Sequence, residues 1–409
     1  MHRPMEGVRI LEVAQFTFVP AAGAVLADWG ADIIKVEHAE TGDAQRGLVR
    51  VLGLAAGKNG SSFAPIMEGP NRGKRSIGIA LDKPEAKPIL EELIKSSDVF
   101  LTNYLPSVAK KLGITLEDVR KINPDIIYVS GSGFGSEGPD ADKGGYDSTA
   151  FWARGGSADG TTPDDADCVS FMPAGAYGDS IGGMTIAGGI AAALYGRKTT
   201  GEPSFVDVSL LAVGAWATQF NINLALLTGG PLPKVQKTTA APGNPLTGNY
   251  RTSDRRWIQL SMLQPTRYWG EFATVIGRED LVDDKRFATM EAMFENKDAA
   301  TNIIADTLAQ RTYDEWVVAF KDMKGQWAAV QNAWDLGNDE ALIANGRIVD
   351  LIDAEGNPQK LVANPVKFDN APVQITRAPG FAEHTDEILR ELGLDDDGLI
   401  ALKIAGAVT

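Results

Sequence analysis

Asp179 is the residue of this chain whose surroundings most suggest chemistry. It lies in residues 172–200, MPAGAYGDSIGGMTIAGGIAAALYGRKTT, just ahead of a long run of glycine, alanine and other apolar residues. An Asp followed by Ser180 and small apolar residues predicts a helix N-cap, which places its carboxylate among the unpaired N–H groups that open the helix. We expect this position to favour the ionised form of the carboxylate.

This arrangement could support an attack on an acyl carbon. An ionised, partly desolvated carboxylate is a nucleophile, the free N–H groups would stabilise an oxyanion, and Gly182 and Gly183 would allow a ligand to approach closely. The alternative is an ordinary helix cap, which most Asp residues at such positions are. No residue from 180 to 196 is charged, and a mildly apolar run of this kind predicts a buried helix more simply than a membrane span.

Length and composition limit the class of protein. With 409 residues, the chain exceeds the usual size of one hydrophobic core, so we expect two domains. A hydrophobic content of 44% and a charged content of 23% are typical of a soluble globular protein. The net charge of -15, with no dense run of Lys or Arg, argues against a nucleic-acid partner, although a local basic group could bind a small polyphosphate.

Cysteine and histidine are scarce. The single cysteine, Cys168, excludes a disulfide framework, and with only three histidines, His2, His38 and His384, we expect no zinc or other metal site. The first residues, MHRPMEGVRILEV, lack a charged start followed by a long apolar run. We therefore expect a cytoplasmic protein with no membrane partner.

Short β-branched runs alternate with helical patterns over the first half of the chain. The expected strands are residues 8–13, 32–37, 76–81, 98–103, 126–130 and 202–208. The expected helices are residues 20–29, 84–95, 107–112, 116–122 and 210–227. This order predicts an α/β fold with an open, doubly wound, mostly parallel sheet, in which ligands bind at the carboxyl ends of the strands.

A dinucleotide-dependent oxidoreductase is one alternative on this architecture. Glu37 closes the second strand where such a fold would hold a ribose. The first turn reads AQFTFVPAAG, however, and lacks the G-x-G-x-x-G phosphate cradle. We therefore expect neither nicotinamide nor flavin as a cofactor.

Two glycine-bearing loops could carry binding residues. The first, residues 38–70, is followed by Arg72, Lys74 and Arg75, and the last two could hold phosphate oxygens as a point charge and a fork. They could equally be solvated cations at the start of a strand. The second loop, residues 131–147, ends in Tyr146 and Asp147.

The chain changes character after a Pro/Gly/Thr-rich linker at residues 229–248. A hairpin and three amphipathic helices, which predict a small α+β domain, are expected at residues 249–263, 265–276, 297–310 and 313–322. We expect residues 1–225 to form the first part of a large domain and residues 226–328 the small domain. Residues 329–409 are then a return segment that completes the large domain.

An ordered set of motifs runs over nearly the whole chain. They are GVRILEV, GADIIKVE, NRGKRSI, TNYLPS, INPDIIYVSGSGFGSEGP, GGYD, GDSIGGM, AAALYGRKTTGEPSFVDVSL and APGFAEHTDEILRELGL. In this order the chain resembles the class III CoA-transferases, named for formyl-CoA, carnitine and bile-acid CoA transfer, which share their fold with the α-methylacyl-CoA racemases. Each motif alone is weak, whereas the ordered set is specific.

The resemblance implies a covalent reaction at Asp179. In the family, the matching aspartate attacks an acyl-CoA thioester to give a mixed anhydride, CoA returns to form an aspartyl-CoA thioester, and an acceptor carboxylic acid takes the CoA through a second anhydride. This agrees with the chemistry expected of the residue itself, since covalent catalysis divides the exchange into acyl transfers. Coenzyme A is then substrate and carrier.

The resemblance also implies a set of contacts. Tyr146 and Asp147 would lie at the thioester end, with Gly182 and Gly183 beside Asp179. The implied contacts to CoA are Thr17, His38, Arg72, Lys74, Arg75, Asn103 and Lys143. Two positions depart from the family, because His38 and Leu105 stand where Arg is usual or frequent, and the family's glycine-rich flap has residues 241–250 as its nearest candidate.

Rival functions stay open. A racemase of the same superfamily needs a second acid/base group, and in that branch a His precedes the Asp of the GYD-like motif. This chain has Tyr146 there, and tyrosine with its ordinary pKa is a poor base at neutral pH, so transferase is favoured. A non-catalytic CoA-binding protein is the alternative from another class.

The resemblance further implies a homodimer in which each chain is a ring threaded through the other. The return segment at residues 329–409 agrees with this, because it would close the chain around the small domain. The acyl group is not identified by the sequence. Its pocket could be lined by four apolar residues that could equally be plain core, namely Phe16, Phe18, Trp152 and Met184.

Overall fold

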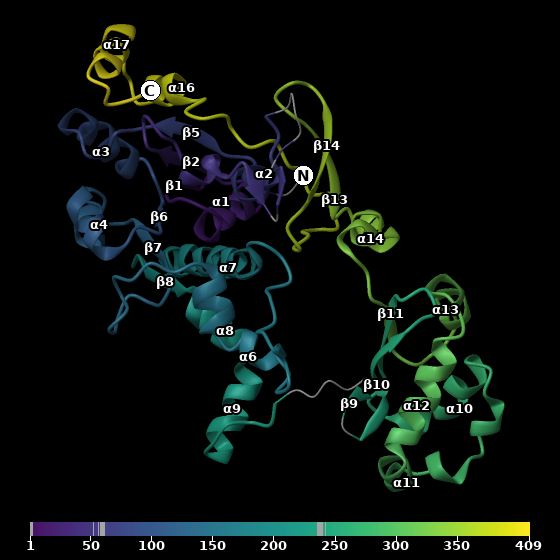
Figure 1. The fold of residues 1–409 in the computed structure, drawn as a ribbon. Helices are drawn as coiled ribbons and strands as arrows, with labels where there is room; N and C mark the ends of the chain where they lie inside the picture. The colour runs from purple at the N-terminus through teal and green to yellow at the C-terminus, as the bar shows by residue number, and fades with distance from the viewer. Residues whose placement is uncertain (1–2, 52, 56, 58–61, 235–239, 242) are drawn as a thin grey trace. The chain divides into compact units, whose positions relative to one another are not determined.

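The computed structural model describes residues 3–51, 53–55, 57, 62–234, 240–241 and 243–409. The chain divides into two compact units. Unit 1 comprises Met1–Thr162, Ala166–Val235 and Glu340–Thr409, and unit 2 comprises Pro163–Asp165 and Gln236–Asp339. Figure 1 shows both units. The expected loop at 38–70, linker at 229–248 and flap candidate at 241–250 lie partly outside the described residues, and His2 lies wholly outside them.

Unit 1 is built on a six-stranded parallel sheet with the strand order β5-β2-β1-β6-β7-β8. The strands are β1 (Arg9–Val13), β2 (Asp32–Glu37), β5 (Arg75–Gly78), β6 (Val99–Thr102), β7 (Ile127–Ser132) and β8 (Phe205–Ser209). All six match an expected strand to within two residues at each end, except that β5 ends at Gly78 and not at residue 81 and β8 begins at Phe205 and not at residue 202. The predicted α/β class is confirmed.

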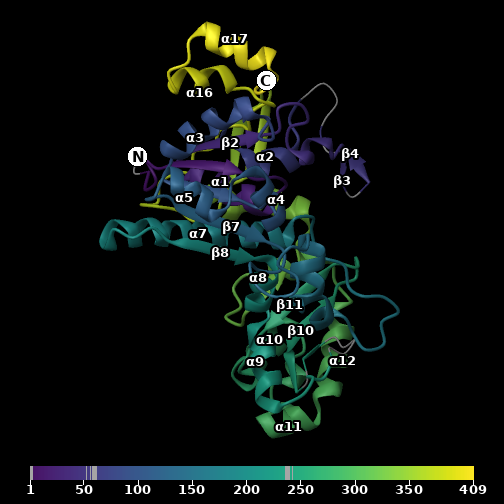
Figure 2. The ribbon, with the colours of Figure 1, turned by 90° about the vertical axis from the view of Figure 1, so that its left-hand side faces the viewer.

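Helices cover both faces of this sheet because successive strand residues point to opposite sides. Ile10 of β1 packs in a core with one group of helices, and Leu11 packs in a second core with another. The first group is α1 (Phe18–Asp28), α7 (Tyr177–Thr200) and α8 (Leu210–Ala217). The second is α3 (Lys87–Lys95), α4 (Pro106–Leu112), α5 (Leu116–Ile122), α16 (Thr385–Glu391) and α17 (Asp396–Ile404). Figure 2 shows α16 and α17 beside α3, which is far from them in the sequence.

The expected helix at residues 210–227 is broken. It forms α8 and α9 (Gln219–Thr228), which are bent by 73° at Thr218. The hydroxyl of Thr218 donates to the carbonyl oxygens of Gly155 and Gly214 at 3.0 Å each, so a local side-chain hydrogen bond marks the bend. Among the described residues no single helix has both the length and the apolar character of a membrane span. Only α8 and α9 taken together meet both conditions, and they are bent at Thr218.

Short elements complete unit 1 between and after the sheet strands. They are η1 (Ala44–Gly47), β3 (Arg50–Val51), β4 (Leu54–Ala55), α2 (Pro65–Asn71), η2 (Pro84–Ala86), η3 (Asp147–Ala153), α6 (Ser157–Thr161), α15 (Glu340–Ala344), β13 (Ile348–Ile352) and β14 (Pro358–Val362). The return segment lies along the sheet edge, where the N–H of His384 donates to Ser76 O at 2.9 Å and the N–H of Ser76 donates to His384 Nδ1 at 3.2 Å.

Unit 2 is a four-stranded antiparallel sheet with helices packed against it. Its elements are β9 (Ala240–Ala241), β10 (Asn244–Arg251), β11 (Trp257–Ser261), α10 (Pro265–Val275), η4 (Glu279–Leu281), η5 (Lys285–Phe287), α11 (Met290–Glu295), α12 (Lys297–Leu308), α13 (Tyr313–Phe320), β12 (Trp327–Ala329) and α14 (Ala333–Gly337). The expected hairpin corresponds to β10 and β11, and the three expected helices correspond to α10, α12 and α13. Trp316 is fully buried at the centre of this core.

Helices α1 and α7 approach each other closely because α7 carries glycines at the contact. A methyl group at Gly183 would lie 2.6 Å from Cβ of Ala21 and 3.1 Å from the backbone nitrogen of Ala22. At Gly182 it would lie 2.3 Å from the ring of Phe18. Side chains at these positions would force the helices apart, so the glycines fix how deeply the start of α7 is set in unit 1.

We expect Gly183→Ala to destabilise the fold by about 1–3 kcal/mol, because overpacking a closed contact costs that much. Gly188→Ala is the matched control on the same helix, since Gly188 is exposed and a methyl group there would touch nothing within 4 Å. Its higher helix propensity should stabilise the protein by about 0.5–1 kcal/mol. Urea unfolding of both variants measures the difference, and equal unfolding midpoints would contradict the prediction.

Candidate active site

Helix α7 presents Asp179 in its first turn. The helix begins at Tyr177, and its N-cap is Ala176, whose φ of 58° is in the left-handed region. The N–H of Ser180 donates to the carbonyl oxygen of Ala176 at 2.9 Å and closes the first turn. The expectation that Asp179 is the N-cap is therefore wrong, because the two residues before it are already helical. Its carboxylate still lies near the helix start, where the first N–H groups have no partner within the helix.

Asp179 is half-buried, and its carboxyl group is hard to ionise. Burial, which disfavours the charged form, raises its pKa to about 7, and the negative charge of Asp147 acts in the same direction. This corrects the expectation that the helix start favours the ionised form, since desolvation outweighs the helix dipole here. Near neutral pH the group exists in both protonation states, which is typical of functional carboxyl groups.

Asp147 is the second carboxyl group at this place, and it is buried. Burial raises the pKa of Asp147, while backbone N–H groups, including those of Tyr177 and Gly178, act to lower it. Its Oδ2 atom has no hydrogen-bond partner among the described residues. Asp147 thus shares the start of α7 with Asp179. No group of three or more His, Cys, Asp or Glu side chains in the described part of the chain could hold a metal ion.

Tyr146 adjoins Asp147 and is largely exposed, at 59%. Its backbone N–H donates to Thr149 Oγ1 at 3.0 Å. Its ring lies edge-on to the ring of Phe16, with 5.6 Å between the centroids and 86° between the planes. The structure therefore brings Tyr146 and Asp147 to the start of α7, and their roles in catalysis stay predictions.

Gly182 and Gly183 do not leave room for a ligand. Both are buried, and the space beside them is filled by α1, as the distances to Phe18 and Ala21 show. They lie in the second turn of α7, where each backbone N–H bonds to the carbonyl four residues earlier. The expectation that these two glycines open the site to an acyl group is wrong, because their contribution is helix packing.

Lys74 is fully buried inside unit 1. Its Nζ donates to both carboxylate oxygens of Glu12 at 2.7 Å each and to the carbonyl oxygen of Pro20 at 2.8 Å. Burial lowers the pKa of Lys74 to about 7, although the charge of Glu12 opposes this. The three N–H donors of the ammonium group are used within the protein, so the expectation that Lys74 holds a phosphate is wrong.

The two neighbouring arginines are also occupied. Arg72 pairs with Asp28 at 2.7 Å, with both side chains nearly buried. Arg75 pairs with Asp32 at 2.8 Å and with Glu391 at 2.6 Å. Arg75 is the first residue of β5, so it lies at the amino ends of the parallel strands, opposite the edge where ligands bind in such sheets. These contacts correct the expectation that Arg72 and Arg75 bind CoA.

Thr17 and Asn103 lie at the carboxyl edge, as expected. Asn103 follows β6, and its side-chain amide bonds twice to the backbone of Gln15, at 3.0 Å and 2.7 Å. The hydroxyl of Thr17 donates to Gln45 Oε1 at 3.0 Å. Both residues therefore shape the loop between β1 and α1, and any contact they make with CoA stays a prediction.

His38 and Lys143 are exposed on loops that follow β2 and β7. Lys143 stands over the ring of Phe134 at 5.5 Å, and the guanidinium of Arg154 stands over the same ring at 4.9 Å. Arg154 also pairs with Asp140. Sequence reasoning did not select Arg154, because it lies beyond the glycine-rich loop and no local pattern connects it with Lys143.

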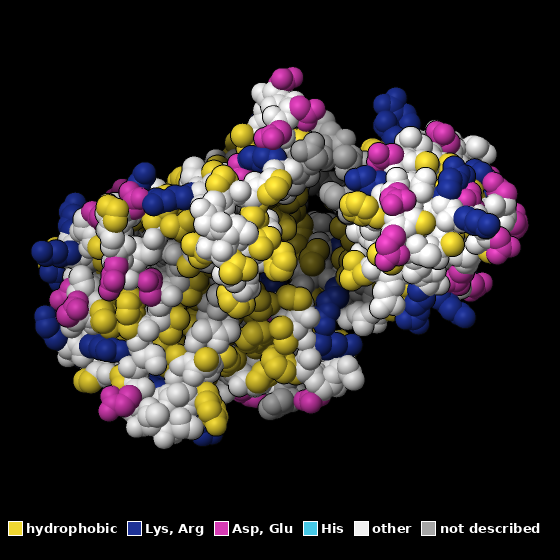
Figure 3. Space-filling model, turned by 90° about the horizontal axis from the view of Figure 1, so that it is seen from below, with side chains coloured by type: hydrophobic (Ala, Val, Ile, Leu, Met, Phe, Trp, Pro, Cys, Tyr) yellow, Lys and Arg dark blue, Asp and Glu magenta, His cyan; other side chains and the backbone are white. Residues whose placement is uncertain are grey.

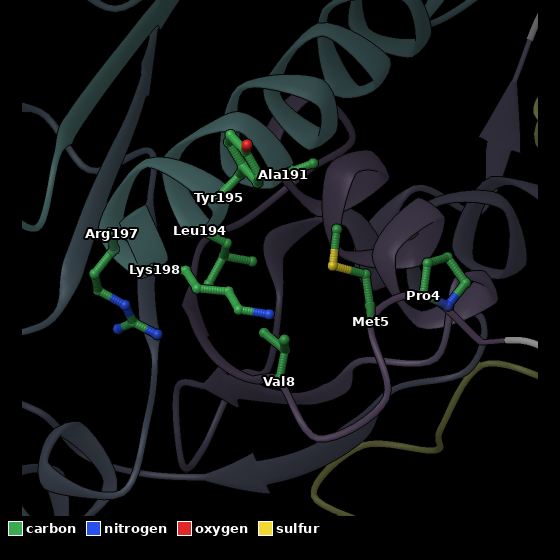
Figure 4. A pocket seen from close by; sticks show the side chains of 8 residues that line it. All are labelled: Pro4, Met5, Val8, Ala191, Leu194, Tyr195, Arg197 and Lys198. Atoms are coloured by element: carbon green, nitrogen blue, oxygen red, sulfur yellow. The ribbon is translucent and has the colours of Figure 1, made fainter. Parts of the chain in front are cut away.

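A hollow of about 490 Å³ lies near the other end of α7 from Asp179, and Figure 4 shows its lining. In that view Arg197 lies at one side of the hollow, and its guanidinium pairs with Asp98 at 2.6 Å. The lining residues are Pro4, Met5, Val8, Ala191, Leu194, Tyr195, Arg197 and Lys198. Because even Ala191, the lining residue of α7 nearest to Asp179, lies 12 residues or about 18 Å of helix away from it, we do not assign the hollow to the acyl group.

Comparison with known proteins shows the family to which the chain belongs. The model of CoA-transferase family III matches residues 5–385. The (R)-2-hydroxy-4-methylpentanoate CoA-transferase of Clostridioides difficile is 31% identical over 400 residues, which is 96% of each chain. The cinnamoyl-CoA:phenyllactate CoA-transferase of Clostridium sporogenes is 32% identical over 404 residues, covering 97% of this chain and 95% of that one.

A solved structure has the same fold. The crystal structure of a CAIB/BAIF family protein from Brucella suis matches with a TM-score of 0.82 and 26% identity, over 96% of this chain and 100% of that one. The resemblance stated from the motifs is thus confirmed along the whole chain. Because the family model covers most of the sequence and relatives above 30% identity cover nearly all of it, this protein belongs to CoA-transferase family III, a family of enzymes that transfer coenzyme A.

Proposed function

We propose that this enzyme moves CoA from an acyl-CoA to a carboxylic acid and that Asp179 is its nucleophile. The observation that carries the proposal is the place of Asp179, half-buried in the first turn of α7 beside Asp147, with its pKa raised to about 7. A carboxylate that is poorly hydrated is a stronger nucleophile than one in water. Family membership supports CoA transfer as the overall reaction.

The proposed steps exchange bonds without water. The Asp179 carboxylate attacks the thioester carbon, the C–S bond breaks, and CoA leaves as a thiolate with an anhydride on Asp179. The thiolate attacks the Asp179 carbonyl, giving an aspartyl-CoA thioester and releasing the first acid as its carboxylate. The acceptor carboxylate then forms a second anhydride and expels the thiolate, which attacks the acceptor carbonyl and regenerates Asp179. Each attack creates an oxyanion that needs hydrogen-bond donors.

The start of α7 offers such hydrogen-bond donors. The backbone N–H groups of Tyr177, Gly178 and Asp179 are the first in the helix and have no acceptor within it. The positive end of the helix dipole also favours developing negative charge there. Asp147 competes for the same donors, so we propose that it orients this turn and keeps Asp179 from ionising too readily.

The carboxylic acids are proposed to be apolar. The two relatives at 31% and 32% identity are named for (R)-2-hydroxy-4-methylpentanoate and for cinnamoyl-CoA and phenyllactate, whose carbon chains carry branched or aromatic groups. Of the four apolar residues considered for a pocket, Phe18, Trp152 and Met184 pack in the core, and Phe16 stands beside Tyr146. An aromatic pair suits an apolar acyl group rather than a second carboxylate.

CoA is proposed to lie along the carboxyl edge of the large sheet. Thr17, His38, Asn103 and Lys143 follow four of its strands, and this edge is where ligands bind in doubly wound folds. His38 and Lys143 are exposed there, which suits contact with a polyanion. Arg154, stacked with Lys143 on one ring, is a further candidate.

A homodimer is proposed from the apolar surface of α8 and α9. Among the described residues none in α9 is buried, and four large apolar side chains are exposed by between 71% and 83%, namely Trp216, Phe220, Leu226 and Leu227. Figure 3, which views the molecule from the side of α9, shows yellow hydrophobic side chains across this face. Exposed apolar surface of this kind marks a protein interface. Interlocking of the two chains is part of the proposal.

Asp179→Ala should lower kcat by at least about 10³-fold, because it removes the nucleophile. Incubation of the wild type with acyl-CoA and hydroxylamine should leave a hydroxamate at Asp179, detected by mass spectrometry of its peptide. Full activity of Asp179→Ala would show that Asp179 is not the nucleophile, and absence of transfer by the wild type would favour a non-catalytic CoA-binding protein. Exchange of the Cα proton with deuterated water would instead indicate a racemase.

Activity should fall as the pH drops through about 7, because the nucleophile must be ionised and the pKa of Asp179 is raised to about 7. Asp147→Asn should move this acidic limb of the kcat profile to lower pH, since it removes the neighbouring charge that helps raise that pKa. Asp140→Asn is the control, an acid on the same loop that pairs with Arg154. An unmoved limb in Asp147→Asn would contradict the assignment.

The enzyme should be a dimer that persists on dilution to micromolar concentration, measured by light scattering. Phe220→Asp should weaken that dimer or lower its Tm, because it places a charge on the proposed interface. Ile404→Asp is a control with similar exposure, 82%, on α17. A monomeric wild type would refute the proposal.

A further inference from the structure

The loop between β1 and α1 is held by a buried ion pair. Lys35 and Asp43 lie 2.8 Å apart with no side-chain exposure. Lys35 also donates to the carbonyl oxygen of Ala14 at 3.0 Å, and Asp43 Oδ1 accepts from the backbone N–H of Phe16 at 3.1 Å. One pair of opposite charges therefore fixes both ends of a three-residue segment at the carboxyl edge of the sheet.

The other residues of this loop are fixed too. Asn103 bonds to both the N–H and the carbonyl of Gln15. Gln45 accepts from the hydroxyl of Thr17. Each residue from 14 to 17 thus has at least one hydrogen bond that holds it, and all four bonding partners lie at least 21 residues away in the sequence.

The conformation of Phe16 indicates that the hydrogen bonds to residues 14–17 serve a function. Its φ of 65° is in the left-handed region, where an aromatic residue is strained and glycine is not. Such strain persists only where the surroundings over-determine the backbone, and it gathers at functional sites. Here the hydrogen bond from Phe16 to Asp43 and the two bonds of its neighbour Gln15 supply that constraint.

The strained conformation places the ring of Phe16 against Tyr146. The edge-on contact has 5.6 Å between centroids, and Tyr146 directly precedes Asp147 at the start of α7. Phe16 is half-buried and Tyr146 is exposed, so the pair has an open side. Asp147 in turn accepts from the backbone N–H groups of Tyr177 and Gly178, so the contact ties the two rings to the turn of α7 that carries Asp179.

We propose that Phe16 and Tyr146 form one wall of the acyl-binding site and select branched or aromatic acyl groups, and that Asp43, paired with Lys35, is the positioning residue that holds Phe16 in this wall. The inference rests on the proposed function, since it assigns a substrate class to the site at Asp179. A buried ion pair adds little net stability compared with apolar packing, which agrees with a role in fixing geometry. Glu12 and Glu37 are the other acids that face Lys35.

Phe16→Gly tests the wall, because it removes the ring and also the strain. We expect kcat/KM for an aromatic acyl-CoA, relative to acetyl-CoA, to fall about tenfold, mainly through KM, while Tm does not fall. Arg255→Gly is the matched control, because Arg255 is another residue with positive φ, 67°, in a turn of unit 2. A wild-type ratio in Phe16→Gly, or a loss equal for both donors, would overturn the proposal.

Asp43→Asn tests the positioning role. Its amide can still accept from Phe16, but the charge opposite Lys35 is gone, and we expect the donor ratio to fall in the same direction as in Phe16→Gly. Asp28→Asn is the control, since it breaks a buried pair with Arg72 away from this loop and should lower Tm without changing the ratio. If Asp43→Asn folds and its donor ratio is unchanged, Asp43 is not a positioning residue. If Asp43→Asn does not fold, the proposed wall is still tested by Phe16→Gly.

The two levels of the proposal fail differently. If transfer by the wild type does not depend on Asp179, the proposed function is wrong and the acyl wall falls with it. If transfer depends on Asp179 and the donor ratio is insensitive to Phe16, only the wall is wrong. Both measurements use the full chain and the same pair of acyl-CoA donors.

Discussion

Burial of charge in the large sheet is the constraint on which the site depends. Glu12 of β1 is fully buried and binds two lysines, Lys74 at 2.7 Å and Lys35 at 3.4 Å. An unpaired charge at such a place would cost several kcal/mol, so each of these groups must keep its partners when the protein folds. β1, β2 and the segment before β5 are thereby locked together, and the loop that follows β1 starts from a fixed base.

Asp179 adds a cost that the rest of unit 1 must offset. Its pKa in the folded protein, about 7, lies above the ordinary value of an aspartate, so the folded state holds a proton that the unfolded chain would release. Stability is therefore lost as the pH rises from the ordinary value of about 4 through about 7, and the proposed reaction needs the ionised form that this rise produces. The tight contact of α1 with α7 at Gly182 and Gly183 opposes any movement that would hydrate the carboxylate. The burial that raises the pKa of Asp179 is thus the same burial that lowers the stability of the folded protein.

Much of this fold could be predicted from the sequence because its signals are local. The runs at β1 and β2 are bounded by polar residues and alternate between two cores, as Ile10 and Leu11 show. Asp179 stood out for a similar reason, as one carboxylate ahead of a long uncharged helix. Its exact place in the helix was missed by three residues, because Ala176 takes a left-handed conformation that no local pattern predicts. The break at Thr218 was missed because a single hydroxyl bonded to Gly155 decides it.

The binding residues were harder to predict because their partners are distant in the chain. Lys74 is a cation near a glycine-bearing loop, and nothing within several residues of it reveals that Glu12 will bury it. Arg75 is likewise a cation next to that loop. Because it begins β5, it lies at the amino edge of the sheet, where it pairs with Glu391 of the return segment. Ligands of open parallel sheets bind at the carboxyl edge, and the position of a cation within its strand decides which edge it occupies. For Phe16 the case is reversed, since a residue that composition assigns to the core is held in a strained loop conformation by a hydrogen bond from its backbone N–H to Asp43.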